Sequence, residues 1–142
     1  MIYTHLTKKA MKISFEAHKD QTDKSGLPYI FHPVHLAEQM TDENTTCVAL
    51  LHDVVEDTDI TFEQLEKEGF SKEIIDALKL MTHDKSVPYM DYVKGIKTNS
   101  IATKVKLADL THNSDLTRLE IVDEKNMKRA EKYRKAIELL LL

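Results

Sequence analysis

A scarcity of turn-forming residues is the feature that most restricts the fold of this chain. Only 3 glycines and 3 prolines occur among the 142 residues, and tight β-turns depend on these two residue types. No segment of useful length alternates apolar and polar residues as a half-buried strand does. The chain is long enough to bury a sizeable core as one unit. We therefore expect an all-α protein with a single domain over residues 1–142.

Apolar periodicity and capping residues divide the chain into successive helices. Thr61 and Gln64 have the spacing of a capping box, and Asn44 or Thr45 can cap the helix that follows residue 45. The expected helices are residues 6–18, 28–40, 46–55, a short one from Thr61 to Gly69, one capped by Ser71, 89–96, a long one opened by Asn99 or Ser100, and one opened by Asp123 that runs to residue 142.

The composition excludes several classes of protein. The net charge of −4 argues against a broad nucleic-acid surface, and no apolar stretch approaches the ~18–20 residues that span a bilayer. The first residues lack the charged-then-apolar order of a signal peptide. The single cysteine, Cys47, lies in an apolar run, which fits a reducing compartment. We expect a cytoplasmic protein that binds neither nucleic acid nor membrane, and we leave its oligomeric state open.

One imidazole and three carboxylates are concentrated in residues 52–57, directly after the apolar run 47–51. His52 and Asp53 are adjacent, so on a helix they point about 100° apart and can hold one ion only if other segments supply further ligands. Glu56 and Asp57 follow them at i+4, which predicts two spare carboxylates beside a metal. The alternative is a solvated acidic helix end, which the preceding apolar run disfavours.

Two more polar residues lie within apolar periodic runs and are candidate ligands. His32 lies in the run 29–33, and Asp109 lies in the run 105–110. Burial of an unpaired imidazole or carboxylate is costly, so each needs a partner. Alone, each is better explained as a hydrogen-bonded core group. Together with His52 and Asp53, they favour a shared divalent cation.

Other side chains near these positions have weaker support. His35 and His112 each follow a candidate ligand by three residues, and either could bind a second metal or the substrate, although packing is the favoured interpretation. Tyr89 and Tyr92 lie at i+3 and predict a core or a pocket wall, with stacking on a base as the alternative. Lysines and Arg118 in the second half of the chain could contact phosphates.

The spaced pattern of His32, His52-Asp53 and Asp109 resembles the HD-domain metal-dependent phosphohydrolases, which are helical bundles. The local sequence is most similar to the hydrolase domain of RelA/SpoT homologues, enzymes that degrade the alarmones ppGpp and pppGpp. Three segments carry the similarity, residues 18–33, 52–58 and 106–113, and the resemblance covers roughly residues 1–120.

The resemblance implies one manganese ion, and the chemistry of the ligands leaves Fe²⁺, Co²⁺ and Zn²⁺ as alternatives. Two imidazoles and two carboxylates form a borderline-to-hard ligand set, which suits these ions. The four ligands that the resemblance implies are His32, His52, Asp53 and Asp109.

The resemblance also implies a reaction and a small-molecule nucleotide as the partner. The reaction is removal of the 3′-pyrophosphate of guanosine 3′,5′-bis(diphosphate), abbreviated ppGpp. Glu56 and Asp57 would act on the attacking water, and Lys24, Ser25 and Asn113 would contact the nucleotide.

Three positions depart from the family pattern. Asp23 and Leu110 stand where the family usually has arginine, and Leu27 stands where it usually has glutamate. The altered edge is the one that recognises the base. Two other functions therefore stay open: a phosphohydrolase for another nucleotide, and a nucleotide-binding regulator without turnover. The Glu56-Asp57 pair argues against the regulator, because a binding module needs no base beside its metal.

Overall fold

The computed structural model describes residues 1–142, and its only β feature is an isolated bridge between Thr22 and Pro28. The prediction of an all-α fold is confirmed. In chain order the elements are α1 (His5–His18), α2 (Phe31–Glu38), α3 (Glu43–Leu51), α4 (Val54–Asp57), α5 (Phe62–Lys67), α6 (Lys72–Met81), α7 (Tyr89–Lys97), α8 (Ser100–Asn113), the 3₁₀ turn η1 (Leu116–Arg118) and α9 (Glu124–Leu141).

Side-chain caps fix where most helices begin. The Thr61 hydroxyl accepts the backbone N–H of Gln64 at 3.2 Å, and the Gln64 side chain accepts the N–H of Thr61 at 2.8 Å, so the predicted capping box is present at α5. Ser71, Asn99 and Asp123 cap α6, α8 and α9. These caps satisfy backbone donors that a helix start leaves without partners.

The second helix begins later than its sequence predicts. We expected it from Pro28, but α2 starts at Phe31. The residues before it close a loop instead: Pro28 pairs with Thr22, and the N–H of Tyr29 donates to the carbonyl of Gln21 at 2.9 Å. These backbone bonds within the loop compete with the first helical turn, and they fix the loop between α1 and α2.

The third helix also differs from the predicted range 46–55. Its cap is Asp42, whose carboxylate accepts the N–H of Thr45 at 2.7 Å. The helix ends at Leu51, and a new turn of helix, α4, starts at Val54. The break falls on the His52-Asp53 pair, so the expectation of one continuous helix through these residues is wrong.

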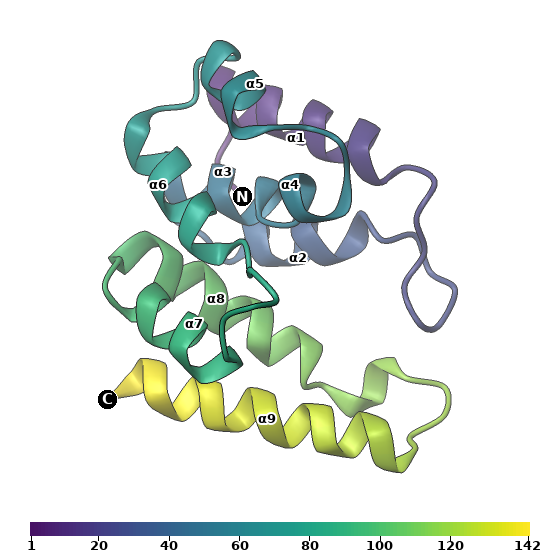
Figure 1. Ribbon diagram of the computed structural model, residues 1–142. Helices are drawn as coiled ribbons and strands as arrows, with labels where there is room; N and C mark the ends of the chain where they lie inside the picture. The colour runs from purple at the N-terminus through teal and green to yellow at the C-terminus, as the bar shows by residue number, and fades with distance from the viewer.

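The core is built around α3, in which every residue from Thr45 to Leu51 is buried. This helix lies against α1, α2, α6 and α8. In Figure 1, α1 to α6 form the upper part of the molecule, α7 and α8 lie below them, and α9 runs along the lower edge. None of the helices combines the length and the apolar character that crossing a membrane requires.

Candidate active site

The break between α3 and α4 sets the direction of His52. Its Nδ1–H donates to the carbonyl oxygen of Ala49 at 2.7 Å, which leaves Nε2 as the nitrogen that faces the interior. Nε2 is buried and forms no hydrogen bond of good geometry, although the Asp53 carboxylate lies 3.0 Å away. Orientation of an imidazole through its other nitrogen is typical of histidine metal ligands.

His32 on α2 and Asp109 on α8 meet His52 at one interior point. Asp109 Oδ1 lies 2.9 Å from His32 Nε2 and 3.5 Å from His52 Nε2. One nitrogen or oxygen of each residue lies within 4.8 Å of the others, and all three residues are buried. Residues far apart in sequence therefore form one cluster, as expected for a site in a helical bundle.

Asp53, which follows His52 in the chain, adds a fourth polar side chain to this cluster. Its Oδ2 lies 3.0 Å from His52 Nε2 and 4.0 Å from His32 Nε2. The hydroxyl of Tyr29 donates to the same oxygen. Burial and the neighbouring carboxylate of Asp53 raise the pKa of Tyr29, so its hydroxyl stays protonated and remains a donor.

Besides the two histidines, Lys106 and Asn113 contact Asp109 and favour its ionised carboxylate. Lys106 Nζ lies 2.9 Å from its Oδ2, and the side-chain amide of Asn113 donates to its Oδ1 at 2.9 Å. Burial opposes ionisation, but the Lys106 ammonium and the hydrogen bond from His32 keep the pKa of Asp109 well below its usual value.

The cluster has the charge and the donor set that a divalent cation requires. Burial opposes protonation of His52, yet the carboxylates of Asp53 and Asp109 hold its pKa well above the usual value. The surrounding carboxylates thus stabilise a positive charge at this point, and a divalent ion supplies that charge in place of the proton. His52 Nε2, which forms no hydrogen bond of good geometry, is the atom that such an ion satisfies.

Glu56 and Asp57 lie on α4 beside the cluster, and both side chains are only partly exposed to solvent. Asp57 keeps its helical relation to Asp53, since its N–H donates to the Asp53 carbonyl at 2.9 Å. Glu56 is positioned from elsewhere, because its Oε1 accepts the backbone N–H of His83 at 3.2 Å. Burial, together with Asp53 and Glu56, raises the pKa of Asp57 to about 6.

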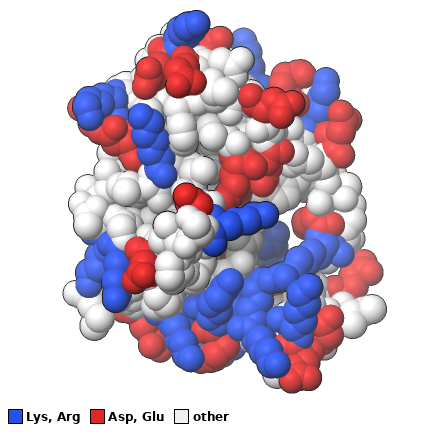
Figure 2. All heavy atoms as spheres, in the orientation of Figure 1, with Lys and Arg blue, Asp and Glu red and all other residues white.

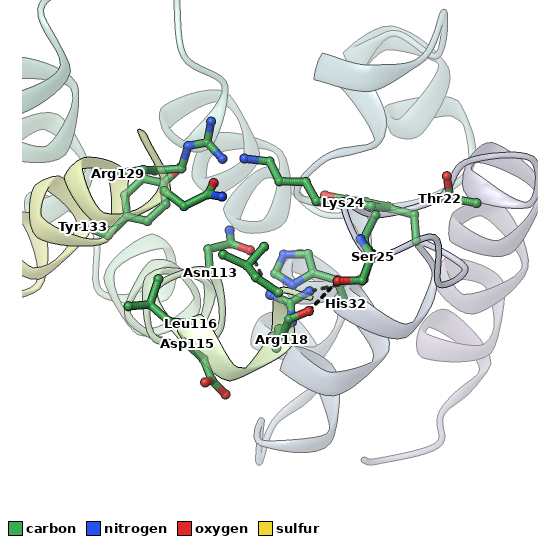
Figure 3. Close-up of a pocket in the computed structure, with 14 residues that line it drawn as sticks. Thr22, Lys24, Ser25, His32, Asn113, Asp115, Leu116, Arg118, Arg129 and Tyr133 are labelled. Atoms are coloured by element: carbon green, nitrogen blue, oxygen red, sulfur yellow. Dashed lines mark hydrogen bonds and ion pairs between the residues drawn. The ribbon is translucent and has the colours of Figure 1, made fainter. Parts of the chain in front are cut away.

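The three predicted substrate contacts line one pocket of about 400 Å³, which His32 also borders. Lys24 and Ser25 come from the loop between α1 and α2, and Asn113 comes from the end of α8. In Figure 3, Lys24 and Arg129 point toward one another across this pocket. Two cations facing one space favour an anionic ligand between them.

Asp23 has a structural role in the same loop. Its Oδ1 accepts the N–H groups of Ser25 and Leu27 at 2.9 and 3.0 Å, around Gly26 with its φ of +79°. Its Oδ2 lies 3.8 Å from the guanidinium of Arg118. Asp23, one of the three residues that depart from the family pattern, therefore closes its own loop.

Arg118 connects that loop to η1. It donates to the carbonyl of His112 at 2.9 Å and to the side chain of Asn113 at 3.3 Å. Its own carbonyl accepts from the hydroxyl of Ser25 at 2.5 Å, a bond drawn in Figure 3. The loop of residues 19–30 is thus tied to the end of α8.

The two histidines with open roles pack against each other and the cluster. His112 Nδ1 lies 2.7 Å from His32 Nδ1, and the ring of His35 stacks on His112 at 4.2 Å. Burial and Arg118 lower the pKa of His112 to about 4, so its ring is neutral, and one of the two Nδ1 atoms donates to the other. His112 therefore contacts His32 directly, and His35 packs on His112.

Sequence reasoning missed the contribution of α9. Arg129 and Tyr133 line the first pocket, and Lys132 and Tyr133 line a second one. The i, i+3 and i, i+4 spacing of these residues places them on one helix face, which could have suggested a shared role. Nothing in the sequence shows which partner that face meets.

Comparison with known proteins agrees with this geometry. Residues 10–109 match the family described as HD domain. The structure of a metazoan orthologue of SpoT that hydrolyses ppGpp superposes with a TM-score of 0.80 at 25% identity, covering 99% of this chain and 88% of that one.

Relatives found by sequence comparison also have names that include the hydrolysis of ppGpp. The chain is 36% identical over 124 residues to the guanosine-3′,5′-bis(diphosphate) 3′-pyrophosphohydrolase MESH1 of Danio rerio, covering 78% of this chain and 68% of that protein. It is 35% identical over 122 residues to the bifunctional (p)ppGpp synthase/hydrolase SpoT of Escherichia coli, covering 75% of this chain. The aligned part spans only 17% of the length of SpoT.

Proposed function

The chain belongs to the HD domain family, and on that premise we propose that it is a metal-dependent phosphohydrolase that removes the 3′-pyrophosphate of ppGpp. The observation that carries the proposal is the cluster of two histidines and two aspartates beside a pocket lined by Lys24 and Ser25. A metal site and an anion-binding pocket in contact are the two parts that hydrolysis of a phosphate ester needs. Residues 1–142 act as one domain in this proposal.

We propose His32, His52, Asp53 and Asp109 as the ligands of a single ion. When bound, a divalent ion supplies positive charge that polarises a phosphoryl oxygen and makes a bound water more acidic. Mn²⁺ suits this donor set, and Fe²⁺, Co²⁺ and Zn²⁺ are the alternatives. The hydrogen bonds of His52 to Ala49 and of Tyr29 to Asp53 hold these ligands in place.

Glu56 and Asp57 move the proton in this proposal. The hydrolysis forms a bond from the water oxygen to phosphorus, breaks the bond from phosphorus to the 3′-oxygen, and returns a proton to that oxygen. A group with a pKa near the working pH transfers protons best, and the pKa of about 6 for Asp57 is in that range. His83 orients Glu56 through its backbone N–H.

Lys24 and Ser25 hold the nucleotide together with Asn113 in this proposal. The ammonium of Lys24 and that of Lys106 balance the charge of the phosphates, while Asn113 also fixes Asp109. Asp23 offers an acceptor in the wall of the pocket, and the N1–H and N2–H₂ groups of guanine are donors.

The buried, unpaired thiol of Cys47 supports a reducing compartment such as the cytoplasm.

A phosphohydrolase for another nucleotide is the second candidate, favoured by the Asp23 carboxylate in the pocket wall. A turnover assay over a nucleotide panel with Mn²⁺, Fe²⁺ or Co²⁺ separates the two. We expect release of pyrophosphate from ppGpp. Turnover of another nucleotide without turnover of ppGpp would replace the first candidate by the second, and binding of nucleotides with no turnover in any metal would leave only a regulator.

A further inference from the structure

Asn113 is exposed to solvent, yet its side chain contacts the proposed metal ligand Asp109. It is the last residue of α8, and its side-chain amide donates to Asp109 Oδ1 at 2.9 Å. The same oxygen lies 2.9 Å from His32 Nε2. Helix ends fray, and water competes for an exposed hydrogen bond. A second contact is therefore required to keep this amide directed at Asp109.

Arg118 supplies that contact from η1. Its Nη1 donates to the side-chain oxygen of Asn113 at 3.3 Å. A guanidinium only donates hydrogen bonds, and an ionised carboxylate only accepts them. The amide of Asn113 therefore satisfies both neighbours only with its oxygen toward Arg118 and its nitrogen toward Asp109. Together the two neighbours fix one orientation of the amide.

The same guanidinium stabilises the last turn of α8. Its Nη1 also donates to the carbonyl oxygen of His112 at 2.9 Å. The last carbonyl groups of a helix have no partner within the helix, and a positive charge is favourable beside them. Arg118 thus satisfies one of these carbonyl groups, in the turn that carries both His112 and Asn113.

Arg118 is itself held by the loop between α1 and α2. The hydroxyl of Ser25 donates to the Arg118 carbonyl at 2.5 Å, and Asp23 Oδ2 lies 3.8 Å from Arg118 Nη2. Figure 3 shows Arg118 between Ser25 and Asn113. A continuous series of contacts therefore runs from this loop through Arg118 and Asn113 to Asp109.

We propose that Arg118 is a positioning residue of the candidate active site, which holds the Asn113 amide in the orientation that supports Asp109. Its side chain forms no hydrogen bond or ion pair with a proposed metal ligand, so it acts through Asn113. Lysine cannot replace it fully, because an ammonium on a flexible stem lacks the rigid fork of donors. The effect on metal binding rests on the proposed function, but the orientation of the amide does not.

Calorimetric titration of the metal-depleted protein with Mn²⁺ tests the series of contacts. Loss of a group that orients a metal ligand weakens metal binding by about 10–100-fold. We expect Asn113→Ala to weaken Mn²⁺ binding on that scale and Arg118→Met to weaken it about tenfold, with partial recovery in Arg118→Lys. Because Arg118 acts through Asn113, the double variant should bind Mn²⁺ as Asn113→Ala alone does.

Charge separates this role from a general electrostatic one. Removal of a cation near the cluster would by itself strengthen the binding of a second cation, so weaker Mn²⁺ binding in Arg118→Met identifies the positioning role. Arg134→Met is the matched control and should bind Mn²⁺ as the wild type does. Arg134 is exposed and contacts only Ala130 and Glu131 of its own helix, α9. Basic side chains gather over this helix in the lower part of Figure 2.

Nuclear magnetic resonance of the metal-depleted protein gives a readout that requires no metal. We expect the side-chain amide protons of Asn113, assigned with Asn113→Ala, to exchange with water several-fold faster in Arg118→Met. Unchanged exchange overturns the proposal, as do equal Mn²⁺ affinities in the wild type and Arg118→Met, or losses that add in the double variant. If both readouts follow expectation but ppGpp is not hydrolysed, the positioning role stands and the proposed function fails.

Discussion

At the scale of single residues, each side chain of the site is oriented by a hydrogen bond to a residue outside the proposed ligand set. His52 presents Nε2 because its Nδ1–H is committed to Ala49, and Asp53 keeps one oxygen in place through Tyr29. Glu56 takes its direction from the backbone of His83. Residue type identified these groups as candidates, and their supporting hydrogen bonds decide what each can do.

Glu56→Gln tests the role of the carboxylate without removing its support. The amide oxygen can still accept the N–H of His83, so the loop should keep its place. We expect metal content to be unchanged and kcat to fall by about 10²-fold or more, the usual scale of general acid–base help. Metal analysis and steady-state kinetics measure both, with Glu63→Gln on α5 as the control. Loss of metal in Glu56→Gln would make Glu56 a ligand instead.

Asp57→Asn tests the raised pKa in the metal-depleted protein. The pKa of Asp57 is about 6 in the folded protein, against an ordinary value of 3.8, so the unfolded chain ionises first as pH rises through this window. Ionisation therefore destabilises the fold progressively from about pH 4 to pH 6 and fully above it. We expect Asp57→Asn to raise the unfolding midpoint at pH 7 and to leave it unchanged near pH 3. Equal shifts at both pH values would contradict the assignment.

At the scale of elements, several capped helix starts were predictable, whereas the starts of α2 and α3 and the break after Leu51 were not. Caps such as Ser71 and Asp123 act on N–H groups two or three residues away, so the sequence alone identifies them. The break after Leu51 depends on partners from other segments, among them Tyr29 and Asp109. No local pattern contains that information.

The same distinction holds for the candidate site. The pattern of histidines and aspartates predicted which residues cluster, because polar groups in apolar runs need partners. The role of Asp23 was not predictable, because its carboxylate closes a turn and faces Arg118 from a distant segment. The two pockets depend on how α9 packs on α7 and α8, which only the folded chain determines.

Asp23→Asn and Asp23→Ala form a matched pair that tests the loop between α1 and α2. Asparagine keeps the oxygen that accepts from Ser25 and Leu27, whereas alanine removes it. We expect Asp23→Ala to raise KM for the nucleotide several-fold, because Lys24 loses its fixed position, and Asp23→Asn to raise it less. Faster hydrogen exchange of the loop amides should accompany the alanine variant. Equal KM values in both variants would exclude the loop-closing role.

At the scale of the whole molecule, the candidate metal site joins α2, α8 and the junction of α3 and α4. A ligand that binds only the folded state stabilises it, by about 2.7 kcal/mol at 100 times its Kd. A chain of this size gains about 2–4 °C in unfolding midpoint per kcal/mol. Bound metal should therefore raise the midpoint by about 5–10 °C.

Chelation followed by differential scanning fluorimetry measures this shift. We expect it in the wild type and in His35→Ala, whose ring packs on His112 and lies outside the proposed ligand set. We expect no metal-dependent shift in His52→Ala or Asp109→Ala. A full shift in both of these variants would remove the cluster as the metal site.

The path of the chain through the site has a consequence for protein engineering. Three of the four proposed ligands precede the loop of residues 82–88, and Asp109 follows it. A chain divided in that loop would give two fragments, neither with a full ligand set, whose apolar faces are complementary across α3, α6 and α8. The divalent ion would then act as a switch for reassembly, and fragment complementation would report metal concentration.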